Sequence, residues 1–323
     1  MTVSSSSTST RVRALAGPHG AGRSPATGDE RRRHDAWSRR LPLLPALIFT
    51  IIATQIPFLI TIWYSLRSWN LLNPASDVFV GLANYAAIFT DSTFRQVALN
   101  SVIYTLGCVL AAMVLGTVFA LLLDRKFRGR GIVRTLLITP FLIMPVASAT
   151  LWGVSMFNPT FGLMNWLLGL VGIPAIDWTS SYPVLSILIA LVWQWTPFMM
   201  LLILAGLQSQ PRDVLEAAQM DGATRWQTFV HITLPHLRRY IELSVLLGAI
   251  YVVNTFDQIY LMTAGGPGSS SANLPYYIYQ RAFLGFDIGQ AAAMGVVVVI
   301  ATIIIANFAL RLIFKGFMST EQN

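Results

Sequence analysis

The stretch Pro211–Pro235, PRDVLEAAQMDGATRWQTFVHITLP, is a polar interruption in an otherwise apolar sequence. Pro211 suits a first helical position, and Asp213 suits the first turn, where a carboxylate meets the positive end of the helix dipole. Asp221-Gly222 is expected to end this helix, because glycine adopts a left-handed backbone without steric cost. The stretch therefore begins with a short helix and a tight turn.

A second helix is predicted directly after the turn. Thr224 and Gln227 have the spacing of a capping box, in which each side chain satisfies a backbone N–H group of the other residue. Pro235 is expected to follow the end of this helix. One helix face carries the larger side chains, which are Trp226, Phe229, Val230 and Thr233. The pair forms a helix-turn-helix, but the four arginines of residues 208–240 are too few for a DNA-binding surface.

The rest of the sequence is strongly apolar. Its 323 residues are 54% hydrophobic and 11% charged, with a mean hydropathy of +0.60, which predicts a membrane protein. The single cysteine, Cys108, excludes an intrachain disulfide and a multi-cysteine metal site. No HExxH or GxSxG motif is present, so no catalytic residue is predicted. The histidines lack zinc spacing and are expected at solvent or interface positions; they are His19, His34, His231 and His236.

Six apolar stretches are each long enough to cross about 30 Å of hydrocarbon as a helix of about 20 residues. They lie near Leu41–Tyr64, Val97–Leu123, Thr135–Phe157, Pro183–Leu207, Ile241–Thr263 and Ala291–Phe314. The predicted fold is therefore an all-α integral membrane protein with six transmembrane helices. Residues 41–315 form its membrane domain, residues 208–240 its polar loop, and residues 316–323 a short tail.

Residues 1–40 are predicted to be a disordered basic tail, because few large apolar side chains are present to offset the ordering entropy. Gly17–Ser24, GPHGAGRS, has the spacing of a phosphate-binding loop, but Arg23 replaces the lysine and no apolar strand precedes it. No nucleotide site is therefore predicted. A cleavable signal peptide is not predicted either, because a full-length span follows the basic residues without a small-residue cleavage site.

The basic residues predict the orientation of the spans. With the amino terminus in the cytoplasm, 19 of the 22 Lys and Arg residues fall in cytoplasmic segments, and only Arg67, Arg95 and Arg281 fall outside. The positive-inside rule then places both termini and the polar loop in the cytoplasm. The same distribution accounts for the net charge of +8 without a nucleic-acid partner.

Small residues and prolines inside the spans predict close packing and bends. Ala112, Gly116 and Ala120 form a small-xxx-small stripe, which allows membrane helices to approach closely. A proline frees a backbone carbonyl and bends its helix, which suits either a gate or a structural kink. The prolines inside spans are Pro57, Pro140, Pro145 and Pro197.

The polar loop resembles the cytoplasmic EAA loop of the inner-membrane permeases of binding-protein-dependent ABC importers. The family pattern is glutamate-alanine-alanine, then aspartate-glycine-alanine, then an isoleucine and a leucine-proline. The matching residues are Glu216, Ala217, Ala218, Asp221, Gly222, Ala223, Ile232, Leu234 and Pro235. The resemblance implies a type I permease fold, in which the first short helix is a coupling helix that docks in a groove of the ATPase subunit.

Other segments resemble carbohydrate-type permeases, and the resemblance covers residues 41–314. Gly81–Tyr85, GLANY, is similar to the GLxNY element of that group. The region after residue 254 looks like the fifth span and outer loop of sugar and polyol permeases of the maltose-transporter type. Its matching segments are Asn254–Gly268, Leu274–Tyr276 and Arg281–Phe283, and the sorbitol/mannitol branch is matched best by Asn273–Tyr276 and Phe286–Gly289.

The resemblance also implies partners and a location. A permease of this kind lies in the bacterial inner (plasma) membrane and pairs with a second homologous permease, two copies of a cytoplasmic ATPase and an extracytoplasmic solute-binding protein. ATP and magnesium bind to the ATPase, so no cofactor and no enzyme activity are expected in this chain. The expected partners include the lipid bilayer but no nucleic acid.

Polar side chains at membrane depth mark a candidate solute path, because they are costly unless they face a cavity or a partner. The path residues are Tyr251, Asn254, Asp257 and Gln258, on one face of the fifth span, and Trp193, Gln194 and Trp195, on the fourth. Amide, carboxylate and aromatic groups together suit a hydroxyl-rich solute. Each residue could equally bond a neighbouring helix or a partner subunit, and Asp257 could face only the outer vestibule.

No Lys or Arg lies deep in any span, which favours a neutral sugar or polyol over an anionic solute. One alternative is an ABC permease for glycerol phosphate or another solute, with the counter-charge supplied by the partner permease. A second is an ion-coupled secondary transporter with Asp257 as its ion site, although such a carrier does not need the helix-turn-helix. The sequence does not identify the solute.

Overall fold

The computed structural model describes residues 44–320, with side chains apart from those of residues 74, 76, 306 and 308–320. The chain divides into two units, residues 1–57 and residues 58–323. Helix α2, Leu44–Ser65, begins in the first unit and ends in the second. The predicted basic tail, residues 1–40, lies outside the described residues.

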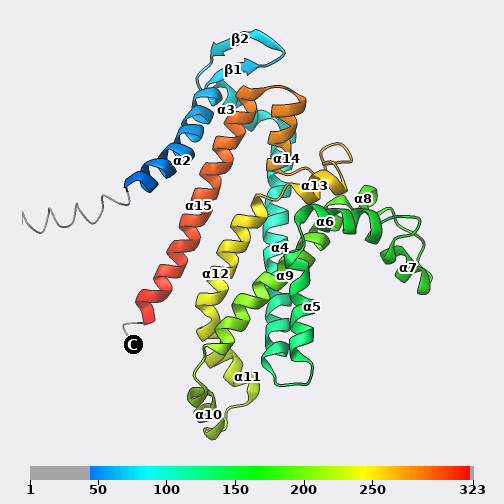
Figure 1. The fold of residues 1–323 in the computed structure, drawn as a ribbon, viewed down its shortest axis with the longest axis vertical. Coiled ribbons are helices and arrows are strands. Elements are labelled where there is room, and N and C mark those ends of the chain that lie inside the picture. The colour runs from blue at the N-terminus through cyan, green and yellow to red at the C-terminus, as the bar shows by residue number, and fades with distance from the viewer. Residues whose placement is uncertain (1–43, 321–323) are drawn as a thin grey trace, which may run out of the picture. The chain divides into compact units, whose positions relative to one another are not determined.

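The second unit is mostly helical (Figure 1). After α2 come a two-stranded antiparallel hairpin, β1 (Arg67–Asn70) and β2 (Asn73–Phe79), and the short α3 (Ala83–Thr90). The hairpin was not predicted. The remaining elements are α4 (Ser92–Asp124), α5 (Arg130–Leu142), α6 (Pro145–Thr150), η2 (Leu151–Met156), α7 (Leu163–Leu170), α8 (Trp178–Ser181), α9 (Pro183–Gln208), α10 (Arg212–Met220), α11 (Arg225–Thr228), η3 (Phe229–Thr233), α12 (Leu234–Val253), α13 (Asp257–Met262), α14 (Leu274–Tyr279), η4 (Gln280–Leu284) and α15 (Ile288–Thr320), where η marks a π-helix.

Among the described residues, four helices are long and apolar enough to cross a membrane: α2, α4, α9 and the Ile288–Ile305 part of α15. A bent pair, α5 with Pro145–Met156, makes a fifth if it counts as one span. The predicted fifth span corresponds to α12, whose charged residues Arg238, Arg239 and Glu242 keep it outside that set. The membrane-spanning helical fold is therefore confirmed, and the count of six is consistent with it.

The third predicted span is not one helix. The chain bends by 96° between α5 and the helix that starts at Pro145. Ile143 and Met144 are extended, with ψ angles of 133° and 139°. This is the effect of Pro145, because a proline disfavours the helical conformation of the residue before it.

The fifth predicted span is also broken. Helix α12 ends at Val253 and α13 begins at Asp257, so the expected continuous helix over Ile241–Thr263 is wrong. The helix after Gly222 also does not end at Pro235, because α11, η3 and α12 follow one another without a break. Pro235 lies in the first turn of α12, after a π turn, where its missing N–H group is tolerated.

The GLANY element closes the hairpin onto α2. Gly81 has a positive φ of +57°, and the Asn84 amide donates to the backbone oxygens of Ser65 and Arg67, both at 2.8 Å. The Tyr85 hydroxyl lies 2.7 Å from Ser65 Oγ. In this chain the motif therefore has a structural role.

Helices α4 and α9 form the centre of the second unit. The predicted stripe lies between them, because Ala112, Gly116 and Ala120 are all buried. A Cβ atom on Gly116 would lie 2.8 Å from the Met200 backbone nitrogen and 2.9 Å from Met199 Cβ. The close approach predicted from the small residues is therefore confirmed.

Replacing Gly116 with alanine is expected to destabilise the protein by about 1–3 kcal/mol, because the added methyl group would overpack the α4–α9 contact. The matched control is Gly295→Ala in α15, where a Cβ atom meets nothing within 4 Å. The effect of each substitution is measured as the melting temperature of the purified complex. Equal melting temperatures for the two variants would contradict the close approach.

Polar side chains near the start of α4 hold the segment between α13 and α14. The Asn100 amide donates to the Ser270 and Ala272 oxygens at 2.8 and 2.9 Å, and the Tyr104 hydroxyl donates to the Ser271 oxygen at 2.9 Å. Asn100 and Tyr104 are each about 1% exposed. These buried polar groups therefore stabilise the fold, and the sequence reasoning did not identify them.

Candidate functional site

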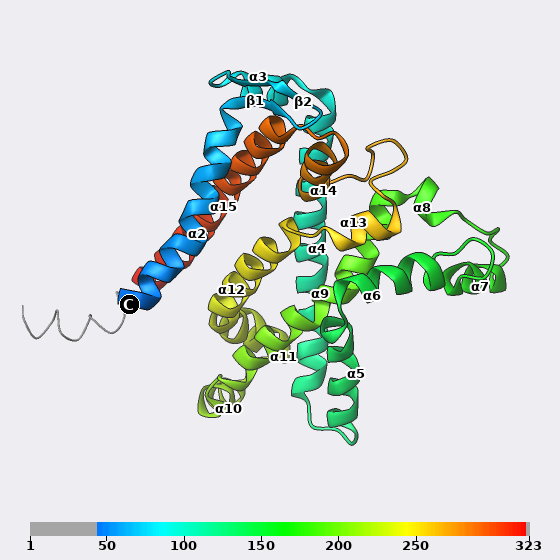
Figure 2. The same ribbon diagram turned by 45° about the horizontal axis from the view of Figure 1, so that its top comes forward.

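The first half of the polar loop has the predicted local structure. Helix α10 begins after Pro211, which is the N-cap rather than the first helical residue, and Asp213 lies in the first turn. Asp221 is the C-cap, and Gly222 has a φ of +80°. Figures 1 and 2 show α10 and α11 beyond the ends of α9 and α12. The short helix and its glycine turn are confirmed.

The second half begins with the predicted capping box. The Thr224 backbone N–H donates to Gln227 Oε1 at 2.8 Å, and the Gln227 N–H donates to Thr224 Oγ1 at 3.3 Å. The rings of Trp226 and Phe229 lie 5.9 Å apart. The capping box therefore fixes the direction in which the chain leaves the turn towards α12.

The loop exposes both polar and large apolar side chains. Val214, Met220 and Trp226 are 44%, 88% and 72% exposed. Apolar side chains this exposed on a charged loop mark a surface that a protein partner would cover. Of the predicted coupling residues, Ala218 is buried and Ala223 is half-buried; the exposed ones are Glu216, Ala217, Asp221, Gly222, Leu234 and Pro235.

The base of the loop is held by a histidine that was expected only at solvent or at an interface. His236 Nε2 lies 3.1 Å from the Gly206 backbone oxygen and 3.1 Å from Ser209 Oγ. The Tyr240 hydroxyl lies 2.8 Å from the same Ser209 oxygen. These contacts join the end of α9 to the start of α12.

Two of the predicted solute-path residues are buried and bonded to each other. The Gln258 amide donates to Gln194 Oε1 at 2.6 Å, and the Gln194 amide donates to the Ile143 backbone oxygen at 3.1 Å. Gln194 is 5% exposed and Gln258 is 3% exposed. The two glutamines join α9, α13 and the bend before Pro145.

Removing the Gln258 side chain is expected to cost about 1–3 kcal/mol of stability, because Gln194 Oε1 would lose its buried donor. The melting temperature of Gln258→Ala should fall, while the solute preference of the transporter stays unchanged. Gln96→Ala is the control, since the Gln96 side chain is exposed and makes one longer contact, at 3.3 Å, with Asn100. A changed solute preference with an unchanged melting temperature would instead make Gln258 a solute contact.

Trp195, which is half-buried, and Tyr251, which is exposed, form an aromatic pair on the predicted path. Their rings are stacked at 5.4 Å with an interplanar angle of 20°. Phe141 and Phe198 lie 5.8 Å from the Trp195 ring and complete a four-ring cluster. Tyr251 is 55% exposed. The cluster therefore lies at the edge of the core, with Tyr251 as its exposed ring.

The other path residues of the predicted fifth span lie at or beyond a break in the helix. Asn254 caps the end of α12, and its amide donates to the Ile250 oxygen at 2.7 Å. Asp257 begins α13 beyond the break and is half-buried. The expected common helix face of Tyr251, Asn254, Asp257 and Gln258 is therefore wrong, because residues 254–256 are not helical.

Trp193 lies on a different surface of α9 from Trp195. Its ring meets Trp152 at 5.7 Å, and both rings line a cavity of about 630 Å³ among α4, α5, α9 and η2. Apart from Thr196, the side chains around this cavity are apolar or aromatic. Trp193 is therefore separated from the four-ring cluster.

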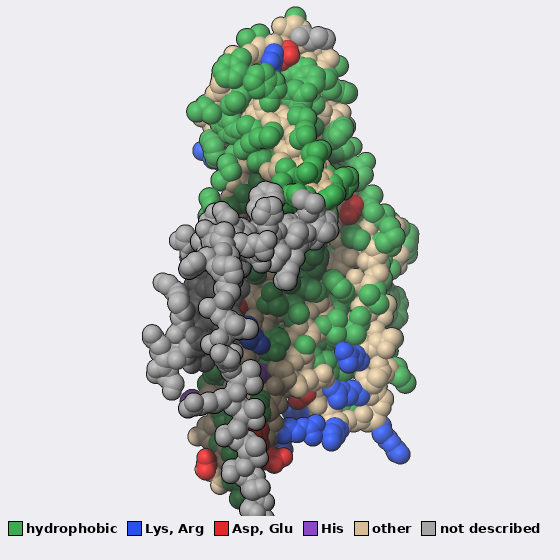
Figure 3. Space-filling view, turned by 60° about the vertical axis from the view of Figure 1, so that its left-hand side comes forward, with side chains coloured by type: hydrophobic (Ala, Val, Ile, Leu, Met, Phe, Trp, Pro, Cys, Tyr) green, Lys and Arg blue, Asp and Glu red, His purple; other side chains and the backbone are tan. Residues whose placement is uncertain are grey.

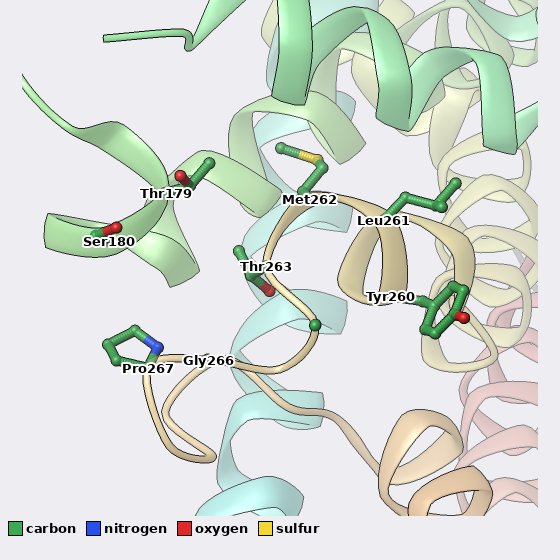
Figure 4. Close-up of a pocket in the computed structure, with 9 residues that line it drawn as sticks. Thr179, Ser180, Tyr260, Leu261, Met262, Thr263, Gly266 and Pro267 are labelled. Atoms are coloured by element: carbon green, nitrogen blue, oxygen red, sulfur yellow. The ribbon is translucent and has the colours of Figure 1, made fainter.

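A smaller hollow of about 370 Å³ lies between α8 and the segment that follows α13 (Figure 4). Thr179 and Ser180 lie on one side of it, and Thr263 points into the space between α8 and α13. None of the predicted path residues lines this hollow. Within residues 44–320, no group of three or more His, Cys, Asp or Glu side chains could hold a metal ion.

Comparison with known proteins places these features in a family. The profile described as "Binding-protein-dependent transport system inner membrane component" matches residues 112–318. The trehalose/maltose transport system permease protein MalF of Thermococcus litoralis is 35% identical over 257 residues, covering 79% of this chain and 86% of the relative. The sulfoquinovosyl glycerol transport system permease protein SmoG of Agrobacterium fabrum is 34% identical over 275 residues, covering 84% and 89%. The crystal structure of a bacterial ABC transporter involved in the import of the acidic polysaccharide alginate has the same fold. The TM-score is 0.75 at 22% identity, and the match covers 88% of this chain and 98% of that chain.

Proposed function

The chain belongs to the family of binding-protein-dependent transport system inner membrane components, and from this premise we propose that it provides half of the path by which a neutral sugar or polyol is imported. It is a multi-pass cell-membrane protein and a sugar-type permease subunit of an ABC importer. Family membership favours this ATP-driven importer over an ion-coupled carrier that uses Asp257.

The observation that supports a sugar or polyol as the solute is the stacked pair of Trp195 and Tyr251. Flat aromatic faces pack against the apolar faces of sugar rings, while the Tyr251 hydroxyl can exchange hydrogen bonds with solute hydroxyl groups. Tyr251 is 55% exposed in the single chain, and a homologous permease facing it would enclose a solute between the two subunits. The four-ring cluster is therefore the part of this chain that contacts the solute.

The exposed surface of α10, its glycine turn and α11 is the proposed contact with a cytoplasmic ATPase. Met220 and Trp226 supply apolar area, and Asp213, Glu216 and Asp221 supply charge around it. An ATPase dimer that closes on ATP would pull this surface, and the contacts of His236 and Tyr240 would carry the displacement into α9 and α12. ATP and magnesium would bind only to the ATPase.

The charge distribution supports an orientation with both termini and α10 in the cytoplasm of a bacterial cell. On the face in Figure 3, Lys and Arg side chains gather at the lower end, while hydrophobic side chains dominate the surface above them. The segment between α4 and α5 alone carries Arg125, Lys126 and Arg128. The positive-inside rule then leaves α8, α13 and α14 on the outer side, where a solute-binding protein would dock.

One relative favours a second candidate, an anionic glycoside. SmoG is named for sulfoquinovosyl glycerol, a sulfonated glycoside, and it is 34% identical to this chain. In the described spans whose side chains are placed, basic residues lie only near helix starts: Arg95 in α4, Arg130 and Arg134 in α5, and Arg238 and Arg239 in α12. An anionic solute would therefore need its counter-charge from the second permease.

ATP hydrolysis by the purified complex with its binding protein tests the proposal. The panel contains neutral disaccharides, sorbitol and mannitol, a sulfonated glycoside and glycerol phosphate. Stimulation by one neutral solute supports the proposed class, and stimulation only by an anion moves the assignment to the second candidate. A chain that associates with no ATPase would overturn the proposed role of α10.

A further inference from the structure

The longest charge-free part of the chain is longer than one membrane crossing requires. Residues 135–176 contain no Asp, Glu, Lys, Arg or His. One transmembrane helix needs about 20 apolar residues, so this segment is about twice as long as a single span. The sequence predicts one span in this segment, near Thr135–Phe157.

The structure divides this segment at the bend before Pro145. Helix α5 has 13 residues, so it rises about 20 Å, which is less than the roughly 30 Å hydrocarbon core. The chain then turns by 96°. We call residues 145–173, which include α6, η2 and α7, the lateral limb. Figures 1 and 2 both show α7 at the far end of this limb, away from α12.

The end of the lateral limb is polar inside and apolar outside. The buried Asn165 amide donates to the Ile176 oxygen at 2.9 Å, and Asn165 Oδ1 accepts from the Ile176 N–H at 3.1 Å and from Trp178 Nε1 at 3.0 Å. The outward side chains form what we call the apolar ledge. They are Phe161, Leu163, Trp166, Leu167, Leu170, Val171 and Ile173, which are between 43% and 72% exposed.

This polarity is the reverse of what an aqueous loop requires. A loop in water turns polar groups outward, and a contiguous apolar patch on a soluble surface is rarely larger than a few hundred Å². Leu142 and Met144, at the bend of a membrane span where the limb begins, are exposed apolar side chains of the same kind, at 73% and 69%. The medium that covers the span therefore also fits the ledge.

We propose that the lateral limb is a re-entrant element seated in the outer leaflet of the bilayer, with lipid acyl chains covering its apolar ledge. Trp166 lies at headgroup level, the depth at which tryptophan is enriched in membrane proteins. A hollow of about 690 Å³ beside it combines the Phe161 and Trp166 side chains with Ser155, Thr160 and Asn165, the mixed chemistry of that depth. The assignment of the limb to the outer leaflet depends on the proposed orientation of the chain, whereas the proposed lipid contact does not.

The limb thereby gives the break before Pro145 a physical role. A chain that enters as α5 and turns sideways leaves space in the outer leaflet, which a seated limb fills without a second crossing. Its exposed side chains are mostly apolar or aromatic, and the polar ones among them, Thr150, Ser155 and Thr160, are uncharged, so no charge is buried in hydrocarbon. Lipid contact then also stabilises the bend that Gln194 holds through the Ile143 oxygen.

Spin labels in the assembled complex, reconstituted in phospholipid nanodiscs, test the proposal. Labels are placed at Trp166→Cys and Leu170→Cys; the native Cys108 is buried and does not compete. Leu106→Cys on the exposed side of α4 is the lipid control, and Leu72→Cys at the hairpin is the water control. Collisions with oxygen report lipid, and collisions with a water-soluble nickel chelate report water.

The expected result is that both ledge labels match the α4 control, with frequent oxygen collisions and nickel collisions reduced roughly tenfold from the hairpin label. Nickel accessibility like that of Leu72→Cys would overturn the proposal in favour of water. Low accessibility to both reagents would overturn it in favour of cover by another subunit. Solute-stimulated ATP hydrolysis of the same samples is a separate readout, so failure of the proposed transport function is distinguishable from failure of the lipid contact.

Discussion

A Gly222→Asp complex is expected to retain less than about a tenth of the wild-type ATP-driven uptake, a loss that corresponds to at least about 1.4 kcal/mol of coupling. Gly222 has a φ of +80° at the end of α10. The variant places a second carboxylate beside Asp221 on the surface proposed to enter the ATPase groove, where like charges and added volume weaken docking. Uptake into proteoliposomes, with co-purification of the ATPase, measures the effect.

Gly129→Asp is the matched control for the backbone. Gly129 also has a positive φ, of +86°, and a Cβ atom on either glycine would meet nothing within 4 Å. Both variants therefore carry a similar left-handed strain of about 1–2 kcal/mol, and only Gly222→Asp changes the turn that ends α10. Near-normal uptake by Gly222→Asp, or an equal loss in Gly129→Asp, would mean that docking at this turn does not limit transport.

The features that the sequence predicted well depend on a few neighbouring residues. The α10 helix, its glycine turn and the capping box of Thr224 and Gln227 are local, because each uses a hydrogen bond or a backbone angle within one or two turns. The contact around Gly116 is long-range, but membrane helices pack closely wherever small residues recur at a spacing of four. Local capping and turn residues, together with the spacing of small residues, therefore account for most of the fold that was predicted correctly.

The broken helices could not be read from composition. An apolar stretch predicts membrane depth but not continuity, so Thr135–Phe157 and Ile241–Thr263 were each taken as one helix. At Pro145 a signal was present, since the residue before a proline avoids the helical region. At residues 254–256 no proline or glycine marks the break, and the contacts that accompany it, such as Gln258 to Gln194, come from distant parts of the chain.

The candidate solute path was predicted in type but not in arrangement. Counting helix turns placed Tyr251 and Gln258 together, whereas the break sends Tyr251 to an exposed cluster and Gln258 into the core. Likewise, Trp193, Gln194 and Trp195 are consecutive residues of α9, so their side chains point in different directions around the helix. A polar residue at membrane depth therefore either bonds a neighbouring helix or contacts the solute, and only the packing distinguishes the two roles.

Replacing Trp195 or Tyr251 with alanine is expected to lower solute uptake roughly tenfold, because each change removes one ring of a stacked pair and the solute-facing aromatic surface. Tyr251→Phe should keep most of the uptake of a solute that uses only the ring face. A larger loss would assign a hydrogen bond to the Tyr251 hydroxyl. Basal ATP hydrolysis should remain, since α10 is unchanged, so the loss appears in solute-stimulated hydrolysis and in uptake.

Trp193→Ala provides the control within the same helix. Its ring has a similar size but lines the apolar cavity beside Trp152 instead of the exposed cluster. We expect Trp193→Ala to lower the melting temperature while solute-stimulated hydrolysis per folded complex stays near the wild-type value. If Trp193→Ala and Trp195→Ala reduce that ratio equally, the four-ring cluster is not the solute contact, because a residue outside the cluster would then matter as much as one inside it.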